Sequence, residues 1–340
     1  MNTLYIIGNG FDLAHGLKTS YSDFLLWYLK QCVDHLEYKG EYTDILLSFT
    51  GTNDFPSIEK INSPDELFRF LKTYGTKCIF FGEFIRNVFT DKNKNWVDIE
   101  SEYYSSIISI LENKNMFDTE FHNIKNYNAQ FDRLKLKLIE YLNEINKSII
   151  GKGEIQDHFN EDEFSNYKQD KYMVLNFNYT TTVDKYISNL QLPITRSINI
   201  HGKLNDPNNP IIFGYGDEMH HHYESLERLN DDKFLFNFKS FGYLRNSNYA
   251  RFEQFINGLQ YRVKILGHSC GLSDRVLLST IFQHKNCRRI EICYHQISEF
   301  ENDHYEKTIR ISRHFSTQMK AEMRRRILPQ DKSKALISIK

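Results

Sequence analysis

Five short runs rich in apolar residues stand out along the chain. They span residues 3–7, 172–175, 197–200, 262–266 and 289–294. Short apolar runs of this kind are typical of buried strands in a parallel sheet. Helical patterns lie between them, for example at 181–190 and 272–284. Strands that alternate with helices predict an α/β fold, a doubly wound parallel sheet covered on both faces.

A long block between the first two predicted strands has a mostly helical pattern. One apolar stripe, at spacings of three and four residues, is formed by Phe24, Leu25, Tyr28, Leu29 and Cys32. Ser63 can cap a helix that has Pro64 in its first turn. We therefore expect a helical insertion of about residues 20–165 within a single domain of residues 1–310.

Charge argues against a general affinity for nucleic acid. The chain has 340 residues, with 43 Lys+Arg against 44 Asp+Glu. No global excess of positive charge exists to displace counterions from phosphate. Basic residues gather only in a predicted C-terminal tail, residues 311–340. A solvated tail or an oligomer contact is the favoured use of this tail, and a nucleic-acid contact is the lesser alternative.

Composition also bears on compartment. No run of about 18 apolar residues predicts a membrane span, and the first residues lack the basic start of a secretory signal. The five cysteines are odd in number and form no CxxC pair. We therefore expect a cytoplasmic protein without disulfides, a structural metal or a membrane contact.

Polar or glycine-containing segments follow four of the five predicted strands. They begin at Gly8, Asn176, His201 and Gly267. In open α/β sheets, ligands bind in the crevice outside the carboxyl ends of the strands. Because these four segments lie at carboxyl ends, we expect them to converge on one site.

The segment after the first strand reads Gly8, Asn9, Gly10, Phe11, Asp12. Glycines here allow a tight turn and let backbone N–H groups approach a pyrophosphate. Leu13 stands where a full dinucleotide fingerprint would have its third glycine. An ordinary strand-to-helix turn is the alternative interpretation.

Asn178 and His201 are candidates for chemistry at the next two strand ends. An Asn amide both donates and accepts, so Asn178 can hold a ribose hydroxyl and an attacking water together; from this segment alone, capping of the next helix is the favoured use. His201, followed by Gly202, can act as a general base on a sugar hydroxyl. The chain has 13 histidines, so a structural role for His201 is the alternative.

The fourth strand end begins Gly267, His268, Ser269, Cys270. Small residues suit a backbone packed against a ligand, and we expect phosphate or ribose contacts from the glycine and the serine, with a structural role as the favoured interpretation of His268. Asp274 can cap the following helix. Cys270 has only His268 as an activating neighbour, so a thiol nucleophile is a minor alternative.

Two further patterns are interpreted conservatively. A metal site at His220, His221 and His222 is not expected, because consecutive residues of a helix do not share a face. The acidic residues Asp98 and Glu100 could place a carboxylate in the site, but a solvated helix face is the favoured interpretation.

With these residues identified, the chain resembles the AbiH-type bacteriophage abortive-infection proteins. The matching stretches are residues 7–21, 96–100, 175–180, 200–205, 212–216 and 267–269. That family in turn is similar to the sirtuin-like NAD-binding domains of bacterial defence proteins. The resemblance implies a Rossmann-like (sirtuin/DHS-like) sheet with a large helical insertion.

The same resemblance implies an NAD site. Asn178 would stand for the catalytic Asn and His201 for the catalytic His, with Asp12 as a compensating negative charge. Residues expected along the cofactor are Gly8, Asn9, Gly10, Phe11, Gly202, Gly267, His268 and Ser269. Thr180 stands where the related domains carry Asp.

We therefore expect an antiviral effector that binds NAD, or a related nucleotide, and hydrolyses the nicotinamide–ribose bond without a metal. It would act as a homo-oligomer or with a partner defence protein. One alternative is a nucleotide-binding sensor or scaffold without turnover, which Thr180 favours. The lesser alternative is an effector directed at nucleic acid.

Overall fold

The computed structural model divides the chain into two compact units, which we call the sheet unit and the helical unit. It describes residues 1–52, 54–90, 96–112, 123–146, 151–160, 171–187 and 194–338. The sheet unit comprises Met1–Leu17, Leu142–Glu218 and Lys239–Lys340. The helical unit comprises Lys18–Tyr141 and Met219–Phe238.

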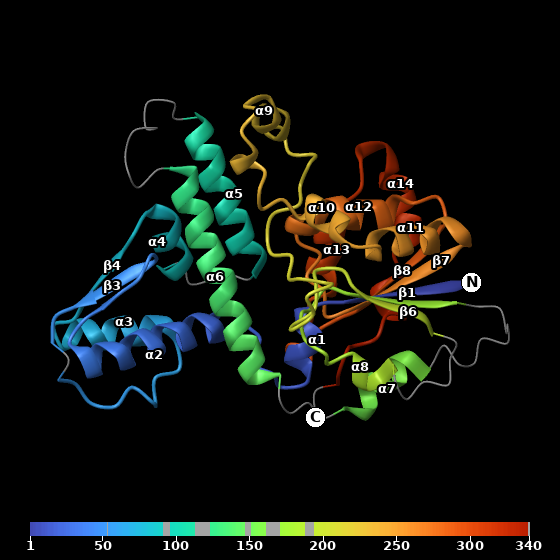
Figure 1. Ribbon diagram of the computed structural model, residues 1–340. Coiled ribbons are helices and arrows are strands. Elements are labelled where there is room, and N and C mark those ends of the chain that lie inside the picture. Colours follow the sequence, from blue (N-terminus) through green and yellow to red (C-terminus); the bar gives the residue numbers. More distant parts are fainter. Residues whose placement is uncertain are drawn as a thin grey trace. The chain divides into compact units, whose positions relative to one another are not determined.

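A five-stranded parallel sheet forms the centre of the sheet unit (Figure 1). Its strands are β1 (Asn2–Ile7), β5 (Tyr172–Asn176), β6 (Ile194–Asn199), β7 (Tyr261–Leu266) and β8 (Cys287–Cys293). They pair in the order β6-β5-β1-β7-β8, and every pairing is parallel. All five strands predicted from the sequence are confirmed. β5 and β6 lie on one side of β1, and β7 and β8 lie on its other side, so β1 is the central strand.

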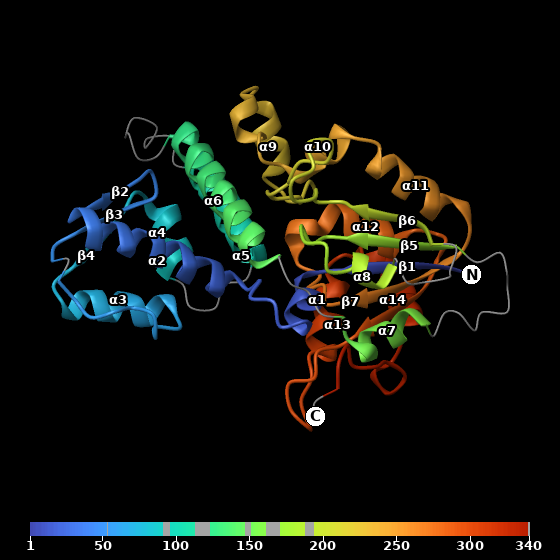
Figure 2. The ribbon, with the colours of Figure 1, turned by 60° about the horizontal axis from the view of Figure 1, so that its bottom comes forward.

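Helices cover both faces of this sheet, as the alternating pattern predicted. The helices of the unit are α1 (Asn9–Ala14), α7 (Gly153–Asn160), α8 (Asp184–Ile187), α10 (Lys239–Gly242), α11 (Asn248–Gly258), α12 (Arg275–Gln283), α13 (His304–Ser312) and α14 (Lys320–Arg326). Short 3-10 turns are η3 (Tyr243–Arg245), η4 (Leu272–Asp274), η5 (Thr317–Met319) and η6 (Gln330–Lys332). In Figure 1, α11 and α12 lie on one side of the strands and α7 and α8 lie on the other. Figure 2 shows β6, β5 and β1 next to one another in the sheet.

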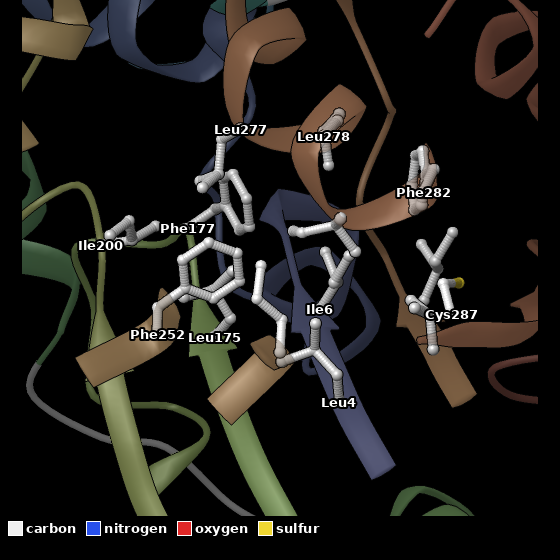
Figure 3. Close-up of a cluster of buried hydrophobic side chains, with 14 of the residues drawn as sticks. Leu4, Ile6, Leu175, Phe177, Ile200, Phe252, Leu277, Leu278, Phe282 and Cys287 are labelled. Atoms are coloured by element: carbon white, nitrogen blue, oxygen red, sulfur yellow. The ribbon is translucent and has the colours of Figure 1, made fainter. Parts of the chain in front are cut away.

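Two buried clusters explain why the strands lack polar alternation. Leu4 and Ile6 of β1 pack with side chains of α11 and α12 such as Leu278 (Figure 3). Tyr5 and Ile7, which point to the opposite face, pack in the second cluster with residues of α1, α7 and α8. Successive residues of a strand face opposite sides, so a strand covered on both faces must be apolar throughout.

The C-terminal residues, where the sequence left a solvated tail or an oligomer contact open, pack against the edge strand β8. The N–H of Leu328 donates to the carbonyl of Ile290 at 2.8 Å. Arg326 is buried, and its Nη1 donates to the carbonyls of Phe282 and His284 at 2.8 Å each. These carbonyls lie at the end of α12, where helix geometry leaves acceptors unpaired.

The helical unit holds most of the predicted insertion. Its helices are α2 (Tyr21–Lys39), α3 (Pro64–Thr73), α4 (Glu83–Thr90), α5 (Trp96–Glu112), α6 (Ile124–Ile145, of which the last residues belong to the sheet unit) and α9 (Tyr223–Arg228), with the 3-10 turn η2 (Asp232–Phe234). The predicted cap of α3 is confirmed, since Ser63 accepts the N–H of Glu66 at 3.2 Å. Among the described residues, no helix combines the length and apolar character that a bilayer crossing requires.

A small antiparallel sheet in this unit was not predicted. Its strands are β2 (Tyr42–Thr43), β3 (Leu47–Thr50) and β4 (Lys77–Phe80), in the order β2-β3-β4. The turn between β2 and β3 depends on Asp44, whose Oδ1 accepts the N–H groups of Leu46 and Leu47 at 2.8 and 3.2 Å. Strands of two to four residues are too short for a periodic pattern to reveal them.

Candidate functional site

The segments that follow β1 and β7 are hydrogen-bonded to each other. The N–H of Gly8 donates to the carbonyl of Leu266 at 3.1 Å, and the N–H of Gly10 donates to the carbonyl of Gly267 at 2.8 Å. Both amides were expected to face a cofactor. In the structure they are already used within the protein, so they do not form the predicted phosphate cradle.

Close backbone packing accounts for the glycines at this point. A Cβ added at Gly267 would lie 2.1 Å from the backbone nitrogen of Phe11, and Gly267 has a φ of +75°. A Cβ at Gly8 would lie 2.5 Å from the Cα of His268. Only glycine permits both the approach and the left-handed backbone at position 267. The glycines therefore join two strand ends.

Phe11, expected along the cofactor, belongs to the core. Its ring is fully buried and packs against Phe159 and Tyr186, with ring centroids 6.5 and 5.7 Å away. Asn9 and Ser269, by contrast, are partly exposed. Of these three expected cofactor residues, only Asn9 and Ser269 thus present surface to a ligand.

Asp12 and Thr180 form a buried pair between the ends of β1 and β5. The Thr180 hydroxyl donates to Oδ2 of Asp12 at 2.6 Å, and Thr182 donates to Thr180 at 3.2 Å. Asp12 is 1% exposed, and among the described residues its Oδ1 has no hydrogen-bond partner. Burial raises the pKa of Asp12 to about 6, against the opposing effect of the Thr180 hydrogen bond.

This pair explains the threonine at position 180. An Asp there would place a second carboxylate against Asp12, and two like charges at this distance cannot both stay ionised. Thr180 instead supplies a donor, and Asp12 supplies the carboxylate. The negative charge beside Asn178 thus comes from the segment after β1.

Asn178 connects the ends of β5 and β1. Its Nδ2 donates to the carbonyl of Gly8 at 3.0 Å, and its backbone N–H donates to Oδ1 of Asn176 at 3.0 Å. The alternative that Asn178 caps the next helix is wrong, because α8 begins only at Asp184. Asn178 therefore lies at the carboxyl end of β5 and is bonded to the end of β1.

His201, at the end of β6, belongs to a buried group of charged side chains that we call the Asp274 cluster. Its members are Asp274, Lys239, His201 and His268. Oδ1 of Asp274 lies 2.7 Å from Lys239 Nζ and 3.2 Å from His201 Nε2, and Oδ2 lies 3.5 Å from His268 Nε2. None of the four residues is more than 6% exposed. The cluster links the carboxyl ends of β6 and β7 to α10.

The charges of the cluster follow from its geometry. Burial opposes ionisation of Asp274, but the ammonium group of Lys239 holds the pKa of that carboxyl well below its usual value. Burial, with the Lys239 charge beside it, lowers the pKa of His201 to about 4. At neutral pH the cluster therefore holds an ion pair and a neutral His201.

Aromatic rings fix the two imidazoles. The Phe177 ring lies edge-on to His201 and His268, with ring centroids 4.9 and 4.3 Å away. Tyr243 stacks on His201, and its hydroxyl lies 3.3 Å from Nε2. Gly202 has a φ of +92°, and a Cβ there would lie 2.3 Å from the carbonyl oxygen of Pro210. The position of His201 is therefore fixed from several sides.

Cys270 is not suited to nucleophilic attack. The residue is 1% exposed, and burial raises the pKa of its thiol to about 12. Its backbone N–H donates to Nδ1 of His268 at 2.9 Å. The minor alternative of a thiol nucleophile is thus contradicted, because the thiolate is strongly disfavoured.

Two conservative interpretations need correction. Glu100 is 4% exposed, so a solvated helix face is wrong for this carboxylate, which lies in the helical unit. His220, His221 and His222 precede α9, and their rings lie together with centroids 4.0–5.5 Å apart. The helical argument against a metal was therefore wrong, although no group of metal ligands occurs among the described residues.

Sequence reasoning missed the roles of Lys239 and Asp274. Asp274 was expected to cap α12, but its side chain makes no cap hydrogen bond. Lys239 gave no signal, because a lone Lys usually lies on the surface. Its flanking residues, Phe238 and Phe241, were the one hint of an apolar setting.

A comparison with protein families gives a match that covers most of the chain. The model of a family described as "Bacteriophage abortive infection AbiH" matches residues 4–296. The matched span reaches from β1 past the end of β8 and includes every member of the Asp274 cluster. No curated protein matches the chain.

Proposed function

The chain belongs to the AbiH family of bacteriophage abortive-infection proteins, and on that premise we propose that its sheet edge binds NAD and hydrolyses the nicotinamide–ribose bond. If the five strands of this sheet are numbered 1 to 5 in chain order, their spatial order β6-β5-β1-β7-β8 becomes 3-2-1-4-5. The same order begins the doubly wound folds that bind dinucleotides outside the carboxyl ends of their strands. We infer a Rossmann-like, sirtuin-related sheet on this basis.

The positions of Asp12, Asn178 and His201 support the proposal. These residues follow three different strands, β1, β5 and β6, each at its carboxyl end. Among the described residues, Oδ1 of Asp12 is buried without a hydrogen-bond partner, and the polar contacts of the His201 ring are made through Nε2. A buried acceptor without a partner costs free energy, so Oδ1 of Asp12 is a natural contact for a polar substrate, and Nδ1 of His201 is the ring nitrogen left for a second one.

Each residue suits one part of the hydrolysis. The bond between ribose C1′ and the nicotinamide nitrogen breaks, and its electron pair leaves with neutral nicotinamide. Water then bonds to C1′ and releases a proton, which gives ADP-ribose. The oxocarbenium-like ribose is stabilised by the Asp12 carboxylate, while Asn178 orients the water and His201 accepts a hydrogen bond from a ribose hydroxyl.

The residues fit the ribose end of NAD better than its diphosphate. The amides of Gly8 and Gly10 are engaged by Leu266 and Gly267, so diphosphate contacts fall to partly exposed residues such as Asn9 and Ser269. His201 and Asp12 are 5% and 1% exposed. The substrate therefore reaches them only after neighbouring segments separate, so we expect activity to depend on a trigger from the phage.

A nucleotide-binding sensor without turnover is the second candidate. The same burial of His201 and Asp12, together with the engaged glycine amides, favours it. Such a protein would act through a partner defence protein or a second copy of the chain.

The test is incubation of the purified full chain with NAD, with and without lysate from phage-infected cells, followed by chromatography of nicotinamide. We expect release by the wild type, a loss of at least tenfold in His201→Ala and Asn178→Ala, and no change in His221→Ala, since His221 is exposed in the helical unit. Calorimetry measures NAD binding separately. Binding without release identifies the sensor, and neither binding nor release in any condition overturns the proposal.

A further inference from the structure

The Asp274 cluster contains an ion pair that the proposed reaction does not use directly. Lys239 and Asp274 are 2% and 6% exposed, and Nζ lies 2.7 Å from Oδ1. Removing two charges from water is costly, and an apolar pair of similar volume is often as stable. Stability alone is therefore a weak reason for this pair.

The carboxylate of Asp274 faces three donors. Lys239 Nζ and His201 Nε2 approach the same oxygen, Oδ1, and His268 Nε2 approaches Oδ2 at 3.5 Å. Nδ1 of His268 accepts the N–H of Cys270, so Nε2 is the ring nitrogen that carries a proton toward Asp274. An ionised carboxylate only accepts hydrogen bonds. It therefore matches all three neighbours at once.

For His201 this arrangement selects one tautomer. A neutral imidazole that faces a carboxylate oxygen through Nε2 carries its proton on Nε2. The lone pair is then left on Nδ1, since the polar contacts of the ring are made through Nε2. Tyr243, whose hydroxyl is 3.3 Å from Nε2, accommodates this tautomer because a hydroxyl can accept as well as donate.

We propose that Asp274 is the positioning residue of His201: it holds the ring with Nε2 protonated and Nδ1 toward the substrate, and Lys239 is the partner that holds Asp274 in place. The role of Nδ1 in turnover rests on the proposed function, whereas the tautomer does not. The logic is that of a catalytic triad, in which a buried carboxylate orients the base without reacting itself.

The tautomer can be measured directly. Nitrogen-15 NMR of the histidine-labelled full chain distinguishes protonated from unprotonated ring nitrogens, and the His201→Gln variant assigns the signal. We expect a single Nε2-protonated form of His201 in the wild type at pH 7.5. We expect both tautomers in the double variant Asp274→Leu, Lys239→Met, which removes the ion pair without leaving an unpaired buried charge.

A conservative variant separates positioning from packing. Asp274→Asn keeps an acceptor for Lys239 and His201 if its oxygen occupies the Oδ1 position, while its amide meets the weaker His268 contact. It should therefore retain the wild-type tautomer of His201. In the NAD assay the double variant should lose activity in kcat to about the same extent as His201→Ala, with KM little changed, because the misoriented ring no longer accepts the ribose hydroxyl through Nδ1. Asp274→Asn should recover part of this loss.

The outcomes separate the two proposals. A wild-type His201 protonated on Nδ1, or an unchanged tautomer in a folded double variant, overturns the positioning role. If the double variant does not fold, the tautomer of His201 in the wild type and in Asp274→Asn still tests the positioning role, because both proteins should carry the proton on Nε2. A tautomer that shifts as expected in a protein that never cleaves NAD supports the positioning role and rejects the hydrolase.

Discussion

Replacing Asp12 with Asn tests whether a buried carboxylate really lies at the end of β1. Asp12 is 1% exposed, and burial raises its pKa from 3.8 to about 6. Below pH 3.8 the carboxyl group is neutral in the folded and unfolded states alike. Between the two pKa values the unfolded chain releases a proton that the folded protein keeps, so stability falls as the pH rises through this window.

The expected size of this effect follows from the two pKa values. They differ by about 2, and each unit corresponds to ~1.4 kcal/mol, so the wild type should lose about 3 kcal/mol between pH 4 and pH 8 from this group. Asp12→Asn is neutral throughout and can still accept the Thr180 hydroxyl. The stability difference between variant and wild type should therefore move by about 3 kcal/mol in favour of the variant over that range.

Urea unfolding of both proteins from pH 4 to pH 8 measures this difference. The difference in free energy of unfolding between the two proteins at pH 4 reports how well the Asn amide packs. Only the change of this difference with pH reports the charge of Asp12. Asp331→Asn, at an exposed carboxylate, is the matched control. A difference between Asp12→Asn and wild type that stays constant with pH would refute the reasoning, because it would mean that Asp12 is solvated.

Three other consequences can be measured. Gly267→Ala should lower the free energy of unfolding by about 4 kcal/mol or more, because its Cβ would lie 2.1 Å from Phe11 N. Gly16→Ala, at φ +77° with open space around it, should lower it by only about 1–2 kcal/mol. Equal losses of stability in thermal melts of the two variants would contradict the packing argument. Arg326→Met should destabilise by roughly 3 kcal/mol, because two carbonyls lose a charged donor; a melting temperature equal to that of the exposed control Arg325→Met would reject this. The thiol of Cys270, whose pKa burial raises to about 12, should resist alkylation at pH 8 until the protein is denatured, and rapid labelling of the native state, located by peptide mapping, would show that it is accessible.

The parallel sheet could be predicted because both of its faces are buried. In β1, Leu4 and Ile6 face one core cluster while Tyr5 and Ile7 face the other, so the strand is apolar at every one of these positions. The small sheet of the helical unit has no such pattern. There Asp44 sets the hairpin through two local hydrogen bonds, and β2 has only two residues.

The segments at the strand ends could be recognised in the sequence, but the contacts that they make could not. Glycines after strands suggest a ligand, but Gly8 and Gly267 serve contacts between two protein segments that are far apart in sequence. The pairing of Lys239 with Asp274 joins residues 35 positions apart in the sequence, one in α10 and the other in η4. A single sequence gives no sign of such a partner, so the ion pair behind His201 could only come from the structure.

The central claim, that this site hydrolyses NAD, is tested most directly by NAD levels in infected cells. Cells that express the wild type are compared with cells that express His201→Ala or the exposed control His221→Ala at equal protein levels, during infection by a phage against which the wild type protects. NAD should fall before lysis with the wild type and with His221→Ala, and both NAD loss and protection should disappear with His201→Ala. Protection by the wild type with NAD unchanged would contradict the account.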